Sequence, residues 1–441
     1  MTAPNSPAPT SWPRVRLGAA DLPCPPDWEQ VEQPHRSQEM VVLRHPFLAA
    51  EAFHPTIVVR SEPTSASLPA LGAQGIAGVI GGLPGARLLA HDRGEVGGLP
   101  ARGQVYAYDA GTVTIVAERW LLLAGTHGVE ITAQCTVEQV EDIEPLFHAV
   151  LDHTVITELQ SGAAAMPEPL AEPPRDGFLA ARSGLDAESL DRVSGAQPYR
   201  PVGPVLSDDT FRFAIHHAGR ERIGKMDLLA APRAGAELVA AGLMEPDGEL
   251  REGFRLMVLP LSLARQSIRI EGVHLQASTQ FDAWLGGGGV TVASRASHAQ
   301  WVQGDETTAI PDGFVCVDVI REESLPLAMA AWAGVGPAWT VMSTIDRIPM
   351  DLFERRLEQG RGVPPPDGAD EPMLRMWEQP WFAWRVIMPG LERELSWLNA
   401  GSAGQYHIGQ GHDGSMRLLA EPSGSVWTTL VRETGILAHV R

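Results

Sequence analysis

The sequence is poor in lysine and cysteine and contains no long apolar run. Among its 441 residues Lys225 is the one lysine, so arginine supplies almost all of the 34 basic side chains, against 54 acidic ones and a net charge of −20. A charge of this sign repels phosphate backbones and anionic lipid, so we expect no nucleic acid as a partner. No segment approaches the roughly 20 apolar residues that a membrane helix needs, so we expect no membrane insertion.

The three cysteines, Cys24, Cys135 and Cys316, lie far apart in the chain. They form neither a CxxC pair for zinc nor an even disulfide framework, and we predict three buried thiols. The first 30 residues contain several prolines and lack the basic start and apolar core of a secretory signal peptide. We therefore expect the protein in the cytoplasm.

The motifs of common enzyme and cofactor sites are missing. The sequence has no GxGxxG that opens a helix, no GxxxxGK[ST], no HExxH and no GxSxG. The near pairs of histidine lack a third ligand at metal spacing. Acidic groups such as Glu141, Asp142 and Glu144 fall at predicted helix N-termini, where the helix dipole favours negative charge, and are interpreted as caps. We expect a protein that is not an enzyme, with no cofactor and no metal site.

Residues 161–204 are rich in proline and small polar side chains and have no helical or strand period, which is typical of an interdomain linker. We therefore place one domain at 14–160 and a larger one at 205–441, with 161–204 between them. Both are long enough to bury a core of their own.

The hydrophobic patterns predict an α+β fold. In the first domain they predict strands at 39–43 and 56–60, a glycine-rich helix at 71–80, three strands between 104 and 135, and a helix at 143–151. In the second domain they predict strands that include 211–215 and 298–303, and capped helices that include one near Ser425. A meander followed by one helix laid across it occurs three times. This layout indicates antiparallel sheets with helices packed on one face.

Tryptophan is concentrated late in the chain, with nine of the 12 after position 280. Trp377, Trp381 and Trp384 stand at a spacing of four and then three. This spacing is compatible with a core packed by large rings, or with an exposed aromatic patch of the kind found at binding interfaces.

A run of four glycines, 286–289, directly follows Phe281 to Leu285. A tight hairpin needs at most two glycines, so four indicate flexibility or the close approach of another group. We predict that Trp284 and Leu285 lie on a mobile hairpin that contacts a partner. In the alternative, Trp284 is buried and the glycines only connect two strands.

Several short segments of the second domain resemble the EspG family, the cytosolic chaperones of type VII (ESX) secretion in actinobacteria. The segments are 236–243, 247–250, 256–260 with the strand at 266–270, and 395–399 with 404–406, where Asn399 and Gln405 depart from the family pattern. The resemblance implies a protein that binds a secreted substrate of the PE/PPE kind, or a secretion component, and catalyses no reaction.

The first domain is similar to the PsbP-like fold of LpqN-type proteins. The resemblance rests on Leu22-Pro23, Pro26-Asp27-Trp28, the strand pair at 54–59, and the meander and helix at 103–156. It implies a domain that binds proteins or small ligands without shared catalytic residues.

Two functions of different classes remain. The first is a cytosolic, non-enzymatic chaperone or adaptor of an actinobacterial type VII secretion system, with a PsbP-like domain followed by an EspG-like domain. The alternative is a small-ligand-binding protein, or an enzyme of unrecognised type, that uses a pocket in the PsbP-like domain. An enzyme in this alternative should show two or more titratable side chains with perturbed pKa values in one cleft. The partner and the oligomeric state stay open.

Overall fold

The computed structural model describes residues 9–31, 40–46, 53–83, 85–157, 188–307, 309–391 and 394–438. By internal contacts the chain forms two compact units that do not follow chain order. Unit 1 comprises Met1–Leu190, Gly336–Trp339 and Pro422–Gly435, and unit 2 comprises Asp191–Val335, Thr340–Glu421 and Ile436–Arg441. The domain bounds 14–160 and 205–441 stay a prediction.

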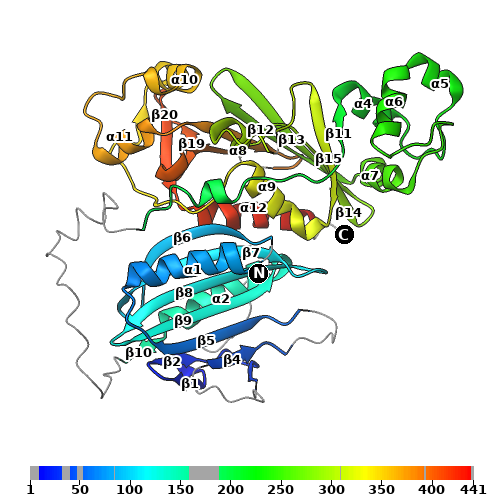
Figure 1. The fold of residues 1–441 in the computed structure, drawn as a ribbon. Helices are drawn as coiled ribbons and strands as arrows, with labels where there is room; N and C mark the ends of the chain where they lie inside the picture. The colour runs from blue at the N-terminus through cyan, green and yellow to red at the C-terminus, as the bar shows by residue number, and fades with distance from the viewer. Residues whose placement is uncertain are drawn as a thin grey trace. The chain divides into compact units, whose positions relative to one another are not determined.

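Unit 1 is built on an antiparallel seven-stranded sheet with the strand order β3-β4-β5-β9-β8-β7-β6 (Figure 1). A small second sheet has the order β1-β2-β10. The elements of this unit are β1 (Arg14–Leu17), β2 (Ala20–Pro23), β3 (Glu29–Gln30), β4 (Met40–Arg44), β5 (Thr56–Pro63), α1 (Leu68–Gly82), β6 (Arg87–Val96), β7 (Leu99–Asp109), β8 (Thr114–Ala124), β9 (His127–Thr136), α2 (Val140–Asp152), β10 (Val155–Ile156) and most of α12 (Ser423–Ala438).

The glycines of α1 let this helix approach the sheet closely. Gln104 of β7 is fully buried and donates from Nε2 to the Gly72 carbonyl at 2.9 Å. The guanidinium of Arg119 on β8 donates to Gln104 Oε1 at 3.1 Å and to the Gly75 carbonyl at 2.8 Å. A Cβ atom at Gly75 would lie 2.6 Å from Gln104 Oε1 and 2.9 Å from Leu121 Cδ1. Glycine in α1 is therefore explained by the close packing of this helix on the sheet.

The other face of the sheet carries α2, whose predicted apolar stripe is buried at Ile143, Phe147, Val150 and Leu151. It also carries α12, which follows the last strand of unit 2 but belongs to unit 1 by its contacts. The prediction that this helix lies across its own meander is wrong. Its buried side chains, which include Trp427 at 1% exposure, complete the core of unit 1 instead.

Unit 2 contains an antiparallel ten-stranded sheet with the order β11-β15-β14-β13-β12-β17-β18-β19-β20-β16. Its elements are β11 (Val205–Ser207), α4 (Asp208–His216), α5 (Lys225–Ala230), α6 (Pro232–Ala240), α7 (Glu252–Ser262), β12 (Gln266–His274), β13 (Ala277–Gly286), β14 (Gly289–Ser294), α8 (His298–Val302), β15 (Phe314–Ile320), α9 (Leu325–Trp332), β16 (Arg347–Ile348), α10 (Met350–Gln359), α11 (Glu371–Glu378), β17 (Phe382–Ile387), β18 (Leu395–Asn399), β19 (Gln405–Gln410) and β20 (Met416–Glu421).

Two segments that were predicted as strands are helices. Residues 211–215 lie in α4, where the Ser207 hydroxyl accepts from the backbone N–H of Thr210 at 3.3 Å. Residues 298–302 form α8 and Gln303 is its C-cap, and the Ser297 hydroxyl accepts from the N–H of Gln300 at the start of the helix. In both cases a serine N-cap outweighs a short apolar pattern that suits either structure.

The three tryptophans at 377, 381 and 384 are part of the hydrophobic core. Their spacing therefore reflects core packing and not an exposed aromatic patch. Trp377, Trp381 and Trp384 are exposed by 3%, 2% and 2%. Trp377 and Trp381 contact edge to face with ring centroids 4.9 Å apart, and Trp384 stacks on Trp397 at 4.5 Å. Offset and edge-to-face pairs of this kind stabilise a core beyond the area they bury.

The α+β class with antiparallel sheets is confirmed. The three cysteines are free and buried, as predicted. Within the described residues, no helix combines the length and the apolar composition needed to cross a membrane.

Residues 161–187 of the predicted linker lie outside the described residues. The rest of the predicted linker, 188–204, is packed against folded structure. Glu188 pairs with Arg102 in unit 1, at 2.9 Å between Oε1 and Nε. Tyr199 is buried in unit 2 and donates from its hydroxyl to Ser294 Oγ at 3.2 Å.

The packing of α1 predicts opposite effects for two glycines of one helix. We expect Gly75→Ala to lower the free energy of unfolding by about 1–3 kcal/mol, because the buried Gln104 amide is held by hydrogen bonds and cannot move aside freely. Gly78→Ala is the matched control. A Cβ atom there meets nothing within 4 Å, so the better helix propensity should raise stability by about 0.5–1 kcal/mol. Urea denaturation measures both, and an equal effect of the two variants would contradict this account.

Candidate functional site

Trp284 and Leu285, the predicted partner-binding residues, lie near the end of β13 and are both half-buried. The Trp284 ring packs against the buried cluster around α4 and α7, with its centroid 6.1 Å from that of Phe211. Leu285 pairs with Val290 of β14. Their contact with a partner stays a prediction.

The glycine run forms a tight hairpin rather than a loose loop. Gly286 pairs with Gly289, and the two central residues, Gly287 and Gly288, have φ angles of +64° and +84°. Positive φ at both positions is the requirement of a type I′ turn. A Cβ atom at Gly286 would lie 2.5 Å from the carbonyl oxygen of Leu263. Close approach of the backbone therefore explains the additional glycine at 286.

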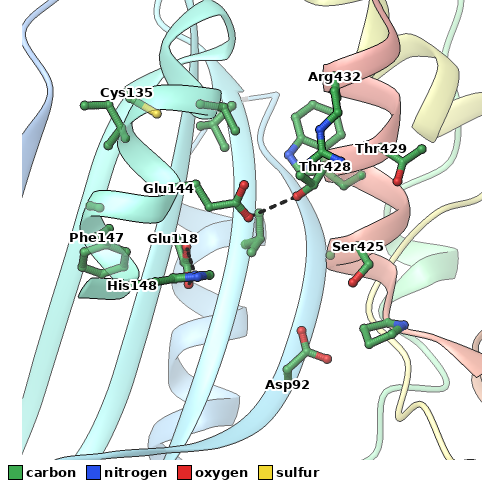
Figure 2. Close-up of a pocket in the computed structure, with 18 of the residues that line it drawn as sticks. Asp92, Glu118, Cys135, Glu144, Phe147, His148, Ser425, Thr428, Thr429 and Arg432 are labelled. Carbon is green, nitrogen blue, oxygen red and sulfur yellow. Dashed lines mark hydrogen bonds and ion pairs between the residues drawn. The ribbon is translucent and has the colours of Figure 1, made fainter. Parts of the chain in front are cut away.

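Unit 1 contains a cavity of about 420 Å³ between α2 and α12, over the part of the seven-stranded sheet that β6, β7, β8 and β9 form (Figure 2). Residues of β6, β7, β8 and β9 form its floor, and the two helices form its walls. The residues that line it are Asp92, Val105, Val116, Glu118, Trp120, Ala133, Cys135, Val140, Ile143, Glu144, Phe147, His148, Pro422, Gly424, Ser425, Trp427, Thr428, Thr429 and Arg432. All of them belong to unit 1.

Two strand glycines make room for the indole of Trp120 on the cavity floor. Gly103 of β7 pairs with both Asp92 of β6 and Trp120 of β8, so these side chains share one face of the sheet. A Cβ atom at Gly94 would lie 2.6 Å from the Trp120 ring, and one at Gly103 would lie 2.9 Å from it. The ring therefore reaches over β7 to β6 and lies beside Asp92.

Glu118, at the centre of the floor, is held by two donors. Trp120 Nε1 donates to Glu118 Oε1 at 2.8 Å, and His148 Nε2 lies 3.0 Å from the same oxygen. The hydrogen bond to Glu118 raises the pKa of His148 above its usual value. A protonated His148 then supplies a positive charge next to this carboxylate.

Glu144 joins the two walls. Its carboxylate extends from α2 towards α12, where the Thr428 hydroxyl donates to Oε1 at 3.2 Å (Figure 2). Burial and the neighbouring Glu118 raise the pKa of Glu144, while the charges of His148 and Arg432 lower it. The interpretation of Glu144 as a helix cap is therefore wrong: Glu141 and Asp142 occupy the first turn of α2, and Glu144 faces the cavity.

Asp92 is the carboxylate without a counter-charge. Part of its surface faces the cavity and the rest is enclosed, and no hydrogen bond or ion pair joins it to another described residue. Burial, with a smaller contribution from the charge of Glu118, raises its pKa from 3.8 to about 6. A protein gains no stability from such a group, which is why perturbed carboxylates in clefts mark candidate functional sites.

The fourth group of interest, Cys135, is an inert thiol. Burial and the charges of Glu118 and Glu144 raise its pKa to about 12, so the nucleophilic thiolate is not formed at neutral pH. Over the described ranges, no three His, Cys, Asp or Glu side chains are arranged to hold a metal ion.

Sequence reasoning missed this site, although two local signals pointed to it. Strand alternation places Val116, Glu118 and Trp120 on one face of β8, where a buried carboxylate is out of place in an apolar pattern. Glu144 and His148 stand four apart on α2 and therefore share a face of the helix. Asp92 had no comparable signal, because β6 was not predicted as a strand.

Comparisons with known proteins give weak structural likeness only. No protein-family model and no curated protein matches the chain. Among solved structures, LpqN of Mycobacterium tuberculosis, described as involved in cell envelope biogenesis, is 16% identical with a TM-score of 0.26, over 31% of this chain and 83% of that one. Cyanobacterial PsbP from Synechocystis is 15% identical with a TM-score of 0.25, over 31% of this chain and 86% of that one.

A protein of unknown function from Pseudomonas aeruginosa is similar at the same level. It is 16% identical with a TM-score of 0.24, over 36% of this chain and 97% of its own length. About a third of the chain thus has weak similarity to LpqN and PsbP-like domains. None of these likenesses concerns the EspG-like expectation, which stays a prediction.

The pKa of Asp92 predicts a pH-dependent effect of Asp92→Asn on stability. The carboxyl group has a pKa of about 6 when folded and 3.8 as its ordinary value, so the folded state binds more protons between these pH values and loses stability as pH rises through them. We expect Asp92→Asn to raise the free energy of unfolding by up to about 3 kcal/mol above pH 7, from roughly 2 pKa units at 1.36 kcal/mol each.

The same gain should be much smaller near pH 4, because there the folded carboxyl is protonated and the unfolded one, with its ordinary pKa of 3.8, is only partly ionised. Urea denaturation at pH 8 and pH 4 checks this. An equal effect of Asp92→Asn at both pH values would show that the pKa of Asp92 is not raised.

Proposed function

We propose that this protein binds a small ligand in unit 1, with the cavity between α2 and α12 as the site. The observation that carries the proposal is the convergence of four titratable side chains with raised pKa values, Asp92, Cys135, Glu144 and His148, in one cavity. Among the two functions that the sequence left open, this convergence favours a small-ligand-binding protein over a chaperone.

The composition of the cavity supports the same proposal. Its size falls in the range of small-molecule sites, roughly 300–1,000 Å³. Apolar side chains cover much of its wall, and a few polar groups converge among them, which is the usual composition of a ligand site. The uncompensated carboxylate of Asp92 lowers the stability of the folded protein. Residues that lower stability in this way are expected at functional sites.

Blocking the cavity tests the proposal. Ser425 is exposed on the first turn of α12 and lines the cavity across from Asp92 (Figure 2). We expect Ser425→Trp to abolish the binding of fragment-sized ligands, because the indole fills the opening, while Ser425→Ala binds them normally. Ligand-observed NMR with matched amine, alcohol and carboxylate fragments measures this. Fragment binding that survives Ser425→Trp would place the site elsewhere and overturn the proposal.

A second candidate is a protein-binding adaptor of type VII secretion, in the cytoplasm, for a PE/PPE-like substrate or a secretion component. An exposed apolar stripe on α7 favours it. Leu256, Leu259 and Leu263 stand at i, i+3 and i+7, and are exposed by 52%, 42% and 52%. Leu259 and Leu263 lie next to the turn of the β13–β14 hairpin, within about 3.3–3.6 Å of a Cβ atom at Gly287. Contiguous exposed apolar side chains are typical of protein-docking surfaces.

The α7 stripe makes a sharper test of the adaptor than Trp284 does. Replacing exposed leucines changes stability by about 0.5 kcal/mol or less, whereas Trp284→Ala also removes core packing. If the adaptor function holds, Leu256→Ser with Leu259→Ser should reduce the capture of a partner from host lysate by about 30-fold or more, because a buried apolar anchor contributes about 2 kcal/mol or more and about 1.4 kcal/mol is a factor of ten. Quantitative affinity purification with mass spectrometry measures the capture.

The control is Leu374→Ser on α11, an exposed leucine at 39% on another part of unit 2. It should leave capture unchanged. An equal loss of capture with Leu374→Ser would mean that the bound proteins recognise apolar surface in general, which contradicts the adaptor function.

A further inference from the structure

One of the three carboxylates that line the cavity of unit 1 has no positively charged partner. Glu118 has His148 at 3.0 Å as its positive partner. Glu144 has the electrostatic influence of Arg432 and the hydrogen bond from Thr428. Asp92 has neither, and the charge that acts on it is the negative one of Glu118. Burying a carboxylate without a counter-charge is strongly unfavourable, so a complete site would supply a positive group next to Asp92.

A second residue that lines the cavity has a polar group without a hydrogen-bond partner. Trp427 is exposed by 1%, and its indole Nε1 has no hydrogen-bond acceptor among the described residues. Most buried polar atoms in native proteins are paired, so each exception calls for an explanation. This buried indole N–H and the part-exposed carboxylate of Asp92, which has no counter-charge, belong to residues that line one cavity.

The surroundings of Asp92 decide which kind of cation fits. A metal ion needs several ligands, and no suitable group of three occurs among the described residues. An organic cation needs a single carboxylate, a nearby aromatic face and apolar walls for its body. The Trp120 ring lies beside Asp92, and a cation over an aromatic face is attracted to it. Apolar walls are provided by Val105, Val116, Ile143 and Phe147.

We propose that the cavity binds a small protonated amine with an apolar body, its ammonium group on Asp92 beside the Trp120 ring and its hydrocarbon part against the apolar wall. This inference rests on the proposed function, because it assigns a ligand class to the same site.

Three probes with one scaffold and different charges test the ligand class: phenylpropylamine, phenylpropanol and phenylpropanoate. At pH 7.5 we expect the full-length protein to bind the amine at least tenfold more tightly than the alcohol, because a hydrogen bond to a charged group contributes about 1.5–3 kcal/mol. The carboxylate should bind least, since Asp92, Glu118 and Glu144 repel it. Isothermal titration calorimetry measures the three dissociation constants.

Asp92→Asn keeps the shape of the side chain and removes its charge. We expect it to weaken phenylpropylamine binding about tenfold, by the loss of one charge-assisted hydrogen bond, and to leave phenylpropanol binding unchanged. The matched control is Glu95→Gln, an exposed carboxylate on the same strand that does not line the cavity. It should leave the binding of both probes unchanged.

The outcomes separate the ligand class from the site. If the alcohol or the carboxylate binds as tightly as the amine, and Ser425→Trp abolishes that binding, the cavity is a ligand site and the amine class is wrong. The amine class is also wrong if Asp92→Asn leaves the preference for the amine intact, or if Glu95→Gln weakens amine binding as much. If no probe binds, or if binding survives Ser425→Trp, the ligand site itself is overturned.

Discussion

The docking of α12 on the sheet of unit 1 is the contact on which the candidate site depends. Its backbone comes so close to β6 that a Cβ atom at Gly424 would lie 3.5 Å from that of Ala90. Thr428 is hydrogen-bonded to Glu144 on the opposite wall. Without this helix the floor of the cavity would face water, where carboxylates need no counter-charge. The enclosure by α12 is therefore what makes the missing charge at Asp92 significant.

Strand alternation divides the polar side chains of this sheet between two environments. His91, Gln104 and Arg119 point towards α1, where hydrogen bonds among them and to helix carbonyls satisfy most of their polar groups. Their direct neighbours Asp92 and Glu118 point into the cavity. On the α1 face protein atoms supply most of the hydrogen-bond partners, and the remaining ring nitrogen of His91 lies 3.6 Å from the carboxylate of Glu188. Those on the cavity face are incomplete, which distinguishes a candidate binding site from a buried polar core.

Unit 2 is stabilised by a different kind of contact, the packing of large aromatic rings. Arg356, exposed by 1%, lies over the rings of Trp377 and Trp381 and donates to the carbonyl groups of Trp377 and Gln379. These contacts join α10 to α11 and to the residues just before β17, and the surrounding core cluster includes side chains of β16, β18, β19 and β20. The α7 stripe lies outside this cluster, so variants of the stripe leave the aromatic core intact. The ligand cavity and the α7 stripe belong to different units, and mutations can address them separately.

The sequence by itself determined most local structure of this protein. The α+β class, the strands of the first meander, α2 with its buried stripe and the buried thiols all follow from patterns within about a dozen residues. It also limited the meaning of the glycines at 286–289 to two physical reasons, and the backbone approach at Gly286 is one of them. At α4 and α8 the prediction from the sequence was wrong. The short apolar run at each place is compatible with a strand and with a helix, and a serine N-cap favours the helix.

The tertiary structure alone decided which distant segments meet. The apolar face of α12 fits any sheet of suitable shape, and nothing in its sequence specifies the sheet of unit 1 over its own meander. Asp92, Glu118 and Glu144 lie on three elements, and their proximity depends on strand order and on which helix covers which face. The raised pKa values of Asp92 and Glu144 arise from this enclosure, because desolvation and charge–charge repulsion act through space and not along the chain. For that reason the candidate site has almost no signature in the sequence.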